Sequence, residues 1–176
     1  IENLREAGLL RPGPLSTAEP GKLQDLVRPA GYYRQKSARL LRIARWVETR
    51  CSPDDVELEA LKEEPLYELR TELLRINGVG PETADSILLY ALEKTVFVID
   101  AYTMRIFGRH ELIEPGLPYS ELQEEFHHQL PDDLELYQDY HAQLVELGKR
   151  FCKKSSPSCS TCPLRPQLGP PVLGEI

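Results

Sequence analysis

The amino-acid sequence predicts an all-α protein. Apolar residues recur at spacings of three and four along most of the 176-residue chain, which is the period of an amphipathic helix. Clusters of glycine and proline separate these periodic segments. Only residues 95–99 (TVFVI) have the β-branched composition of a strand, and no partner strand is evident. We therefore interpret this stretch as a buried extended link, in a chain long enough for two small lobes.

The N-terminal half is predicted to be helical at residues 16–27, 34–49, 65–76 and 81–92, and residues 1–10 resemble the end of a further helix. Ser16 or Thr17 is a candidate N-cap, because a side-chain hydroxyl accepts from the N–H groups of a first turn. Pro81 suits the first helical position, where its missing N–H costs nothing. The acidic segment 51–64 is anchored by Leu58 and Leu61.

The C-terminal half is predicted to be helical from residue 101 and at residues 120–130 and 131–150, with a loosely ordered Pro/Gly-rich tail from residue 163. Asp100 is a candidate N-cap, and Ser120 with Gln123 has the spacing of a capping box. We expect three parts: the end of an N-terminal helical part at 1–15, a helical lobe at 16–94, and a C-terminal helical lobe at 95–176.

Charge is unevenly distributed along the chain. The formal net charge is −7, which by itself disfavours binding to nucleic acid. However, residues 34–50 and 149–154 are strongly basic, whereas residues 111–146 contain no Lys or Arg. This pattern favours one DNA-facing side and an acidic opposite side. The alternative is that Arg39, Arg42 and Arg45 only form the solvated face of a helix.

Residues 77–81 (NGVGP) interrupt two helical segments and predict a tight helical hairpin. Gly78 and Gly80 allow positive φ and a close approach of the backbone to another molecule. The second helix then presents its N-terminal N–H groups and the positive end of its dipole, which suits a phosphate. The alternative is a plain turn, in which the glycines serve only the chain reversal.

The hairpin resembles that of the endonuclease III superfamily of DNA glycosylases. Residues 73–84 (LLRINGVGPETA) carry the Gly-Val-Gly and Thr-Ala of that motif. Residues 96–100 (VFVID), followed by Arg105, resemble its hydrophobic link, essential aspartate and arginine. Residues 31–36 (GYYRQK) resemble its Gly-x-Tyr-x-x-Lys segment. Residues 80–85 (GPETAD) are most similar to the branch of endonuclease III-related proteins that resemble 3-methyladenine DNA glycosylase.

This resemblance implies a two-lobed helix-hairpin-helix fold and a catalytic role for Asp100. Cleavage of an N-glycosidic bond builds positive charge on the sugar, and a carboxylate stabilises that charge or takes a proton from water. Asp100 is otherwise only a helix cap. Members of the family that also cut the strand use a lysine where this chain has Glu82, and a carboxylate cannot form their Schiff base. Glu82 places water or a cationic base, or it is only a favourable first-turn residue.

The resemblance also implies residues that hold DNA and the flipped base. The DNA-binding residues are Gly78, Val79, Gly80, Thr83, Arg34, Lys36 and Arg105. A base must leave the stack to be excised, and aromatic rings suit a cationic alkylated purine. The base-pocket candidates are Tyr33 and Tyr102, with Tyr32 as a further tyrosine; buried core tyrosines are the commoner alternative.

Three of the four cysteines crowd the C-terminus, which favours a metal or iron–sulfur site over disulfides. Cys152, Cys159 and Cys162 have the spacing of the family's [4Fe–4S] loop, which implies a cluster there. The family's fourth cysteine corresponds to Leu168, and Cys51 lies elsewhere in the chain. A lost cluster, or zinc with His141 as fourth ligand, are the alternatives.

The predicted function is base-excision repair by a monofunctional DNA glycosylase that hydrolyses the bond to a damaged, alkylated base. The expected partner is double-stranded DNA containing that base, bound by a monomer in the cytoplasm at the nucleoid, without a membrane. Two alternatives remain open: a bifunctional glycosylase and abasic-site lyase, and a non-catalytic module that binds DNA structure.

Overall fold

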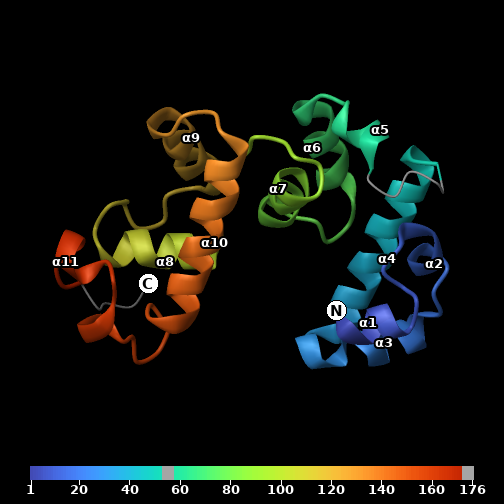
Figure 1. The fold of residues 1–176 in the computed structure, drawn as a ribbon, viewed down its shortest axis with the longest axis horizontal. Coiled ribbons are helices and arrows are strands. Elements are labelled where there is room, and N and C mark those ends of the chain that lie inside the picture. The colour runs from blue at the N-terminus through green and yellow to red at the C-terminus, as the bar shows by residue number, and fades with distance from the viewer. Residues whose placement is uncertain (53–57, 172–176) are drawn as a thin grey trace. The chain divides into compact units, whose positions relative to one another are not determined.

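The computed structural model describes residues 1–52 and 58–171, and its regular elements within these ranges are all helical (Figure 1). The prediction of an all-α fold is therefore confirmed. The chain forms two compact units, Ile1–Ala84 and Asp85–Ile176. Helix α7 (Pro81–Tyr90) begins in the first unit and continues into the second. None of the helices in the described ranges is long and apolar enough to cross a membrane.

The first unit is organised around its longest helix, α4 (Tyr33–Arg50). Its other elements are α1 (Glu2–Glu6), α2 (Pro12–Ser16), α3 (Pro20–Val27), η1 (Arg28–Ala30), α5 (Glu59–Lys62) and α6 (Leu66–Arg75). Helices α2 and α3 pack against α4. A buried apolar cluster joins α1, α3 and α4 through Leu4, Leu9, Leu23, Val27 and Leu41. Residues 1–10 therefore contribute to this core through two leucines.

The helix expected at residues 16–27 begins later, as α3 at Pro20, and Ser16 belongs to the preceding helix α2. Ser16 ends α2 instead of capping the next helix, and its Oγ donates to the carbonyl of Gly13 at 2.8 Å. Glu19 is the N-cap of α3, because its carboxylate accepts from the N–H groups of Gly21 and Lys22 at 2.8 and 2.6 Å. Pro20 explains the break, since a residue before proline is driven into the extended region. Part of the acidic segment 51–64 lies outside the described residues.

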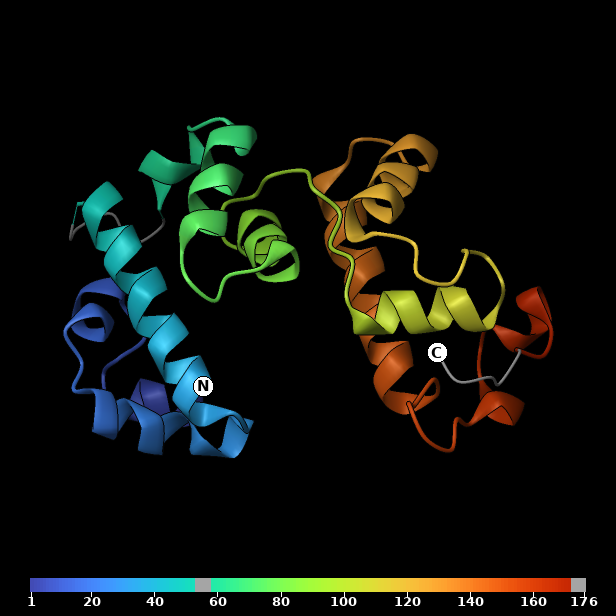
Figure 2. The same ribbon diagram turned by 180° about the vertical axis from the view of Figure 1, so that it is seen from behind.

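The second unit contains the rest of α7 together with α8 (Ala101–Arg109), α9 (Tyr119–Gln129), α10 (Leu134–Arg150), η2 (Cys159–Thr161) and α11 (Arg165–Leu168). Helix α8 packs across α10 (Figure 2). The approach is close at Gly148, where a Cβ atom would lie 2.2 Å from Cδ1 of Tyr102. Any larger residue at Gly148 therefore requires the Tyr102 side chain of α8 to shift. Helix α11 lies within the tail that the sequence predicted to be loosely ordered.

Residues 95–99 form the buried extended link that the sequence predicted. Side chains of α9 satisfy its backbone: Nε2 of His127 accepts from the N–H of Phe97 at 2.9 Å, and Nε2 of Gln123 donates to the carbonyl of Phe97 at 2.6 Å. The predicted capping box was wrong. Helix α9 begins at Tyr119 without a side-chain cap, and Gln123 is buried beside the link.

Candidate active site and DNA-binding surface

The hairpin turn connects α6 to α7 through a tight, exposed backbone. The N–H of Val79 donates to the carbonyl of Ile76 at 2.9 Å, and Val79 itself is buried. Gly78 has φ +90°, a conformation that other residues rarely adopt. Gly80 has an ordinary φ and differs from the expectation in this respect. A Cβ atom at Gly80 would meet no described atom within 4 Å, so its backbone is open to an approaching molecule.

Two arginines of α4 support this turn. Nη1 of Arg42 donates to the carbonyl of Asn77 at 3.1 Å. The side chain of Arg39 packs against Gly78, where a Cβ atom would lie 3.0 Å from its Nε. Sequence reasoning weighed these arginines only as a basic surface or a solvated helix face. Their spacing of three residues, which places both on one face of α4, was the available signal.

The other residues predicted to bind DNA from the first unit have separate surroundings. Nζ of Lys36 donates to the carbonyl of Ala30, and Arg34 is exposed with its guanidinium 5.8 Å from the ring centroid of Tyr33. In the first turn of α7, Glu82 is exposed and Thr83 is partly exposed. Thr83 and Glu82 therefore directly follow the hairpin glycines, while Asp100 belongs to the second unit.

Asp100 is the N-cap of α8, as the sequence predicted. Its Oδ1 accepts from both the N–H and the Oγ1 of Thr103, at 2.7 and 2.9 Å. Its Oδ2 faces Nε2 of His141 at 3.7 Å, which is longer than a hydrogen bond. Burial raises the pKa of Asp100, but His141 and the two Thr103 donors together outweigh burial and lower the pKa. Asp100 is therefore an ionised carboxylate that is only 8% exposed.

The two predicted base-pocket tyrosines both have arginine neighbours. The Tyr33 ring lies 4.8 Å from the guanidinium of Arg28, and Tyr32, Tyr33 and Arg34 line a shallow hollow with Gln35. The Tyr102 ring lies 5.0 Å from the guanidinium of Arg105 and packs on Gly148. Tyr33 and Tyr102 belong to different units. Cation–π contact thus already occurs at each ring, with a residue of the protein itself.

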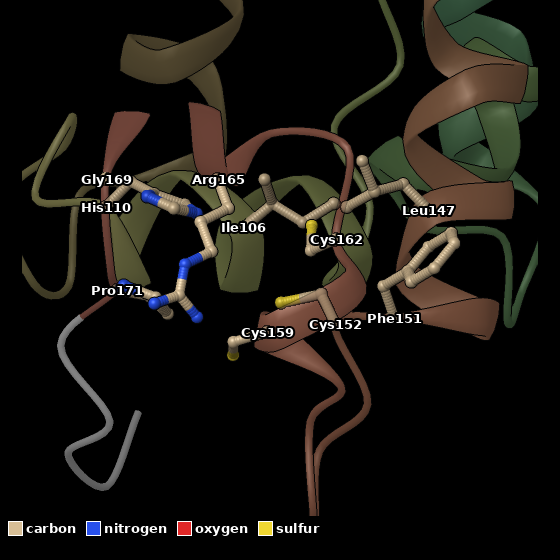
Figure 3. Close-up of a pocket in the computed structure, with 10 residues that line it drawn as sticks. All are labelled: Ile106, His110, Leu147, Phe151, Cys152, Cys159, Cys162, Arg165, Gly169 and Pro171. Carbon is tan, nitrogen blue, oxygen red and sulfur yellow. The ribbon is translucent and has the colours of Figure 1, made fainter. Parts of the chain in front are cut away.

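Cys152, Cys159 and Cys162 line one pocket beside α8 and α10 (Figure 3). Arginines of α8 hold the loop that follows α10. Nη1 of Arg109 donates to Sγ of Cys152 at 3.3 Å and to the carbonyl of Lys153 at 2.8 Å, and its Nη2 donates to the carbonyl of Lys154 at 3.0 Å. Nε of Arg105 donates to the carbonyl of Cys152 at 2.7 Å. Arg105, predicted to bind DNA, therefore supports this loop.

The described residues do not fit a cluster with four thiolates. Leu168, at the place of a fourth cysteine, is a 40% exposed residue of α11, and Cys51 belongs to the other unit. Within residues 1–52 and 58–171, no three His, Cys, Asp or Glu side chains are gathered closely enough to hold a metal ion. His141, the zinc ligand considered from the sequence, faces Asp100 instead of the pocket.

His110, which sequence reasoning missed, does line the cysteine pocket (Figure 3). Its Nδ1 is buried without a hydrogen-bond partner among the residues that the structure describes. Burial lowers the pKa of His110, which favours the neutral imidazole. No sequence pattern links His110 to the cysteines, because it reaches them only through the position of α8.

Solved structures resemble this fold. An endonuclease III in a non-covalent complex with DNA superposes with a TM-score of 0.70 at 21% identity, covering 93% of this chain and 71% of that chain. The H. pylori 3-methyladenine DNA glycosylase bound to 1,N6-ethenoadenine gives a TM-score of 0.68 at 30% identity, covering 84% of this chain and 74% of that chain.

Sequence comparison gives the same result. A protein of Methanocaldococcus jannaschii named as a DNA repair glycosylase is 43% identical over 94% of this chain and 74% of its own length. The endonuclease III of Thermotoga maritima is 31% identical over 88% of this chain and 66% of its own length. The model of the family described as "HhH-GPD superfamily base excision DNA repair protein" matches residues 1–132. The chain therefore belongs to the HhH-GPD superfamily of base excision DNA repair proteins, as an endonuclease III-like DNA glycosylase.

Proposed function

We propose that this protein is a monofunctional DNA glycosylase that hydrolyses the N-glycosidic bond of an alkylated base flipped out of duplex DNA. The observation that carries the proposal is Asp100: a nearly buried carboxylate at the start of α8, held ionised by Thr103 and by the facing His141. A fixed negative charge with little solvent around it is suited to stabilise a developing cation.

The reaction requires one water molecule and no other co-reactant. The C1′–N bond breaks with its electron pair moving to the base, and the sugar becomes like an oxocarbenium ion. Asp100 stabilises this cation and accepts a proton from the water whose oxygen bonds to C1′. An alkylated purine that carries positive charge leaves as a neutral base. The products are the free base and an abasic site, and the proton passes from Asp100 to solvent.

Glu82 supports the monofunctional assignment. It occupies the first turn of α7 directly after the hairpin, where the resemblance places the lysine of strand-cutting relatives. A carboxylate has no nucleophilic amine, so no Schiff base forms at Glu82 and the strand stays intact. We assign to Glu82 the placement of water or of the cationic base.

We propose that the hairpin binds duplex DNA. The backbone at Gly78, Val79 and Gly80, together with the start of α7 at Thr83, suits a phosphate, and Arg34 and Lys36 add positive charge nearby in the sequence. Arg105 is proposed to contribute to DNA binding indirectly, because it holds the cysteine loop in place. Tyr33 and Tyr102 are each proposed as a candidate contact for the flipped base, and each ring has an arginine beside it. The protein is proposed to act as a monomer.

The proposed substrate class is supported by the likeness to a 3-methyladenine DNA glycosylase, which covers 84% of this chain at 30% identity. The [4Fe–4S] cluster that the cysteine spacing implied is not assigned a role, because the described residues lack four suitable ligands. The proposed reaction depends on Asp100 alone for its charge.

Incubation of the protein with end-labelled duplexes tests this proposal. The duplexes contain 3-methyladenine, thymine glycol or uracil, and each reaction is analysed with and without alkali. We expect base release from the 3-methyladenine duplex and strand breaks only after alkali, because an abasic site is alkali-labile. Strand breaks without alkali would show a lyase, and tight binding without release from any duplex would show a DNA-structure-binding module.

A further inference from the structure

His141 is a buried group next to Asp100 whose own hydrogen bonding and protonation the proposed reaction leaves undefined. The side chains of His141 and Asp100 are only 10% and 9% exposed. Nε2 of His141 has no hydrogen-bond partner within the part of the chain that the structure describes, and it faces Oδ2 of Asp100 at 3.7 Å. A buried polar nitrogen without a partner costs free energy, and a shift of a few tenths of an ångström closes this gap.

The other ring nitrogen of His141, Nδ1, contacts Tyr90. The Tyr90 hydroxyl lies 2.7 Å from Nδ1 of His141 and 3.1 Å from the carbonyl of Gln138, to which it can donate. Burial and the nearby charge of Asp100 raise the pKa of Tyr90, so the phenol keeps its proton. The titratable groups that meet here are Tyr90 of α7, Asp100 at the start of α8 and His141 of α10.

Hydrogen counting restricts the state of the His141 ring. Tyr90 has one hydroxyl hydrogen. If it donates to Nδ1, the neutral ring carries its hydrogen on Nε2. If it donates to Gln138, then Nδ1 must carry a hydrogen, and the ring faces an ionised carboxylate favourably only when Nε2 is protonated as well. In both favourable states Nε2–H points at Oδ2 of Asp100. The remaining state turns a lone pair toward the carboxylate and is repulsive.

We propose that His141, oriented by Tyr90, is a positioning residue that fixes Oδ2 of Asp100 through Nε2–H while Thr103 fixes Oδ1. The inference rests on the proposed function, because it concerns the carboxylate of that reaction. Both carboxylate oxygens are then held by the protein before the sugar cation forms. A preorganised charge needs no reorganisation during the reaction.

The test compares His141→Leu, His141→Gln and Tyr90→Phe with His128→Leu, an exposed histidine of α9. For His141→Leu we expect kcat/KM for base release to fall roughly 10- to 100-fold, which corresponds to the loss of one charge-assisted contact. DNA affinity should stay unchanged. The acid limb of the pH profile should move to higher pH, because Asp100 loses a group that lowers its pKa. His141→Gln keeps an N–H donor and should restore most of the rate and the position of the limb.

Tyr90→Phe should have a smaller effect of the same kind, and His128→Leu should have none. A rate loss that is equal at every pH, or that the Gln variant does not relieve, would mean that His141 only packs, and would overturn the inference. Loss of rate in His128→Leu would overturn it as well, because the effect would then not be specific to the position.

A measurement that needs no activity separates this inference from the proposed function. Nitrogen NMR of the full chain should show a proton on Nε2 of His141 near neutral pH, and carboxyl-carbon NMR should show Asp100 titrating at higher pH in His141→Leu than in the original protein. An unprotonated Nε2 beside an ionised Asp100 would overturn the inference, whatever the enzyme does. If these signals are as expected and no lesion is excised, only the proposed function fails.

Discussion

The starts of α7 and α8 are built from the same physical element in opposite ways. Each is a helix N-terminus, with N–H groups that the helix itself leaves without partners and a positive dipole end. The start of α7 follows the exposed backbone of Gly78 and Gly80, and no described atom lies near the missing Cβ of Gly80. At the start of α8, by contrast, the N–H of Thr103 is already occupied by the carboxylate of Asp100, which is only 8% exposed.

We propose that this difference separates DNA binding, at the start of α7, from base release, at the start of α8. An open N-terminus accepts an anion from outside, as a phosphate contact requires, and reads no base sequence. A closed N-terminus stabilises an anion of the protein itself and keeps it ionised. Changes at the hairpin glycines before α7 should therefore affect DNA affinity, whereas a change at Asp100, the N-cap of α8, should affect the rate of base release.

The largest effect is expected from Asp100→Asn. Loss of the fixed charge should reduce base release about 1000-fold. Asparagine is also a good N-cap, so the free energy of unfolding should change by less than about 1 kcal/mol. Single-turnover kinetics measure the rate of base release, and a binding titration on the same duplex measures DNA affinity. Equal loss of binding and rate would contradict the separation of the two helix starts.

Gly148→Ala should be the most damaging to stability. Its Cβ would lie 2.2 Å from Cδ1 and 2.9 Å from Cβ of Tyr102, so the Tyr102 side chain must lose its packing between α8 and α10. We expect a loss of about 1–3 kcal/mol in the free energy of unfolding, measured in urea, together with slower base release. Gly13→Ala in α2 is the control, because its Cβ meets only a flexible carboxylate at 3.4 Å. A stable Gly148→Ala protein would mean that α8 is not held where the structure places it.

Gly78→Ala and Gly80→Ala should separate strain from contact in the hairpin. Alanine at φ +90° and against Arg39 should cost about 1–2 kcal/mol of stability. Alanine at Gly80 fills open space at an ordinary φ, so stability should hold while DNA binding weakens. For both variants, urea unfolding measures stability and fluorescence anisotropy measures DNA affinity. Unchanged DNA binding in Gly80→Ala would remove the hairpin backbone from the binding surface.

The smallest effect on activity is expected from Leu168→Cys, at the far end of the second unit. Only three thiols line the pocket, so the original protein should lack the visible absorbance of a four-thiolate iron–sulfur cluster. Leu168→Cys should supply the fourth thiol and gain that absorbance after anaerobic reconstitution, with base release unchanged. A cluster already present in the original protein would point to His110 as a ligand, and His110→Leu would then remove it.

The sequence predicted the parts of the fold that depend on local pattern. Examples are the hairpin, the buried link at residues 95–99 and the cap at Asp100. The predictions of helix caps were wrong where a side chain forms its hydrogen bonds outside its own helix or where a proline sets the helix start. Gln123 looked like a local cap but satisfies the link instead, and Glu19 caps a helix that Ser16 was expected to start. Local rules consider only neighbours in the sequence. The role of Gln123 depends instead on its burial beside the link, and the role of Glu19 depends on the proline that follows it.

The surroundings of the site were beyond the sequence for the same reason. His141 and Tyr90 meet Asp100 only because α7, α8 and α10 come together, and no spacing in the chain records that meeting. The N-cap position of Asp100 was predictable from its local sequence, whereas its catalytic role stays a prediction from the resemblance. Arg109 was not singled out, although it is buried and makes three contacts with the cysteine loop.

The contacts of Arg109 and Arg105 with the loop after α10 have a consequence for oxidation of the cysteines that line the pocket. The loop after α10 is tied to α8 mainly through backbone carbonyls, which neither oxidise nor depend on iron supply. Oxidation of the thiols would therefore alter the pocket lining while these hydrogen bonds between the loop and α8 remain.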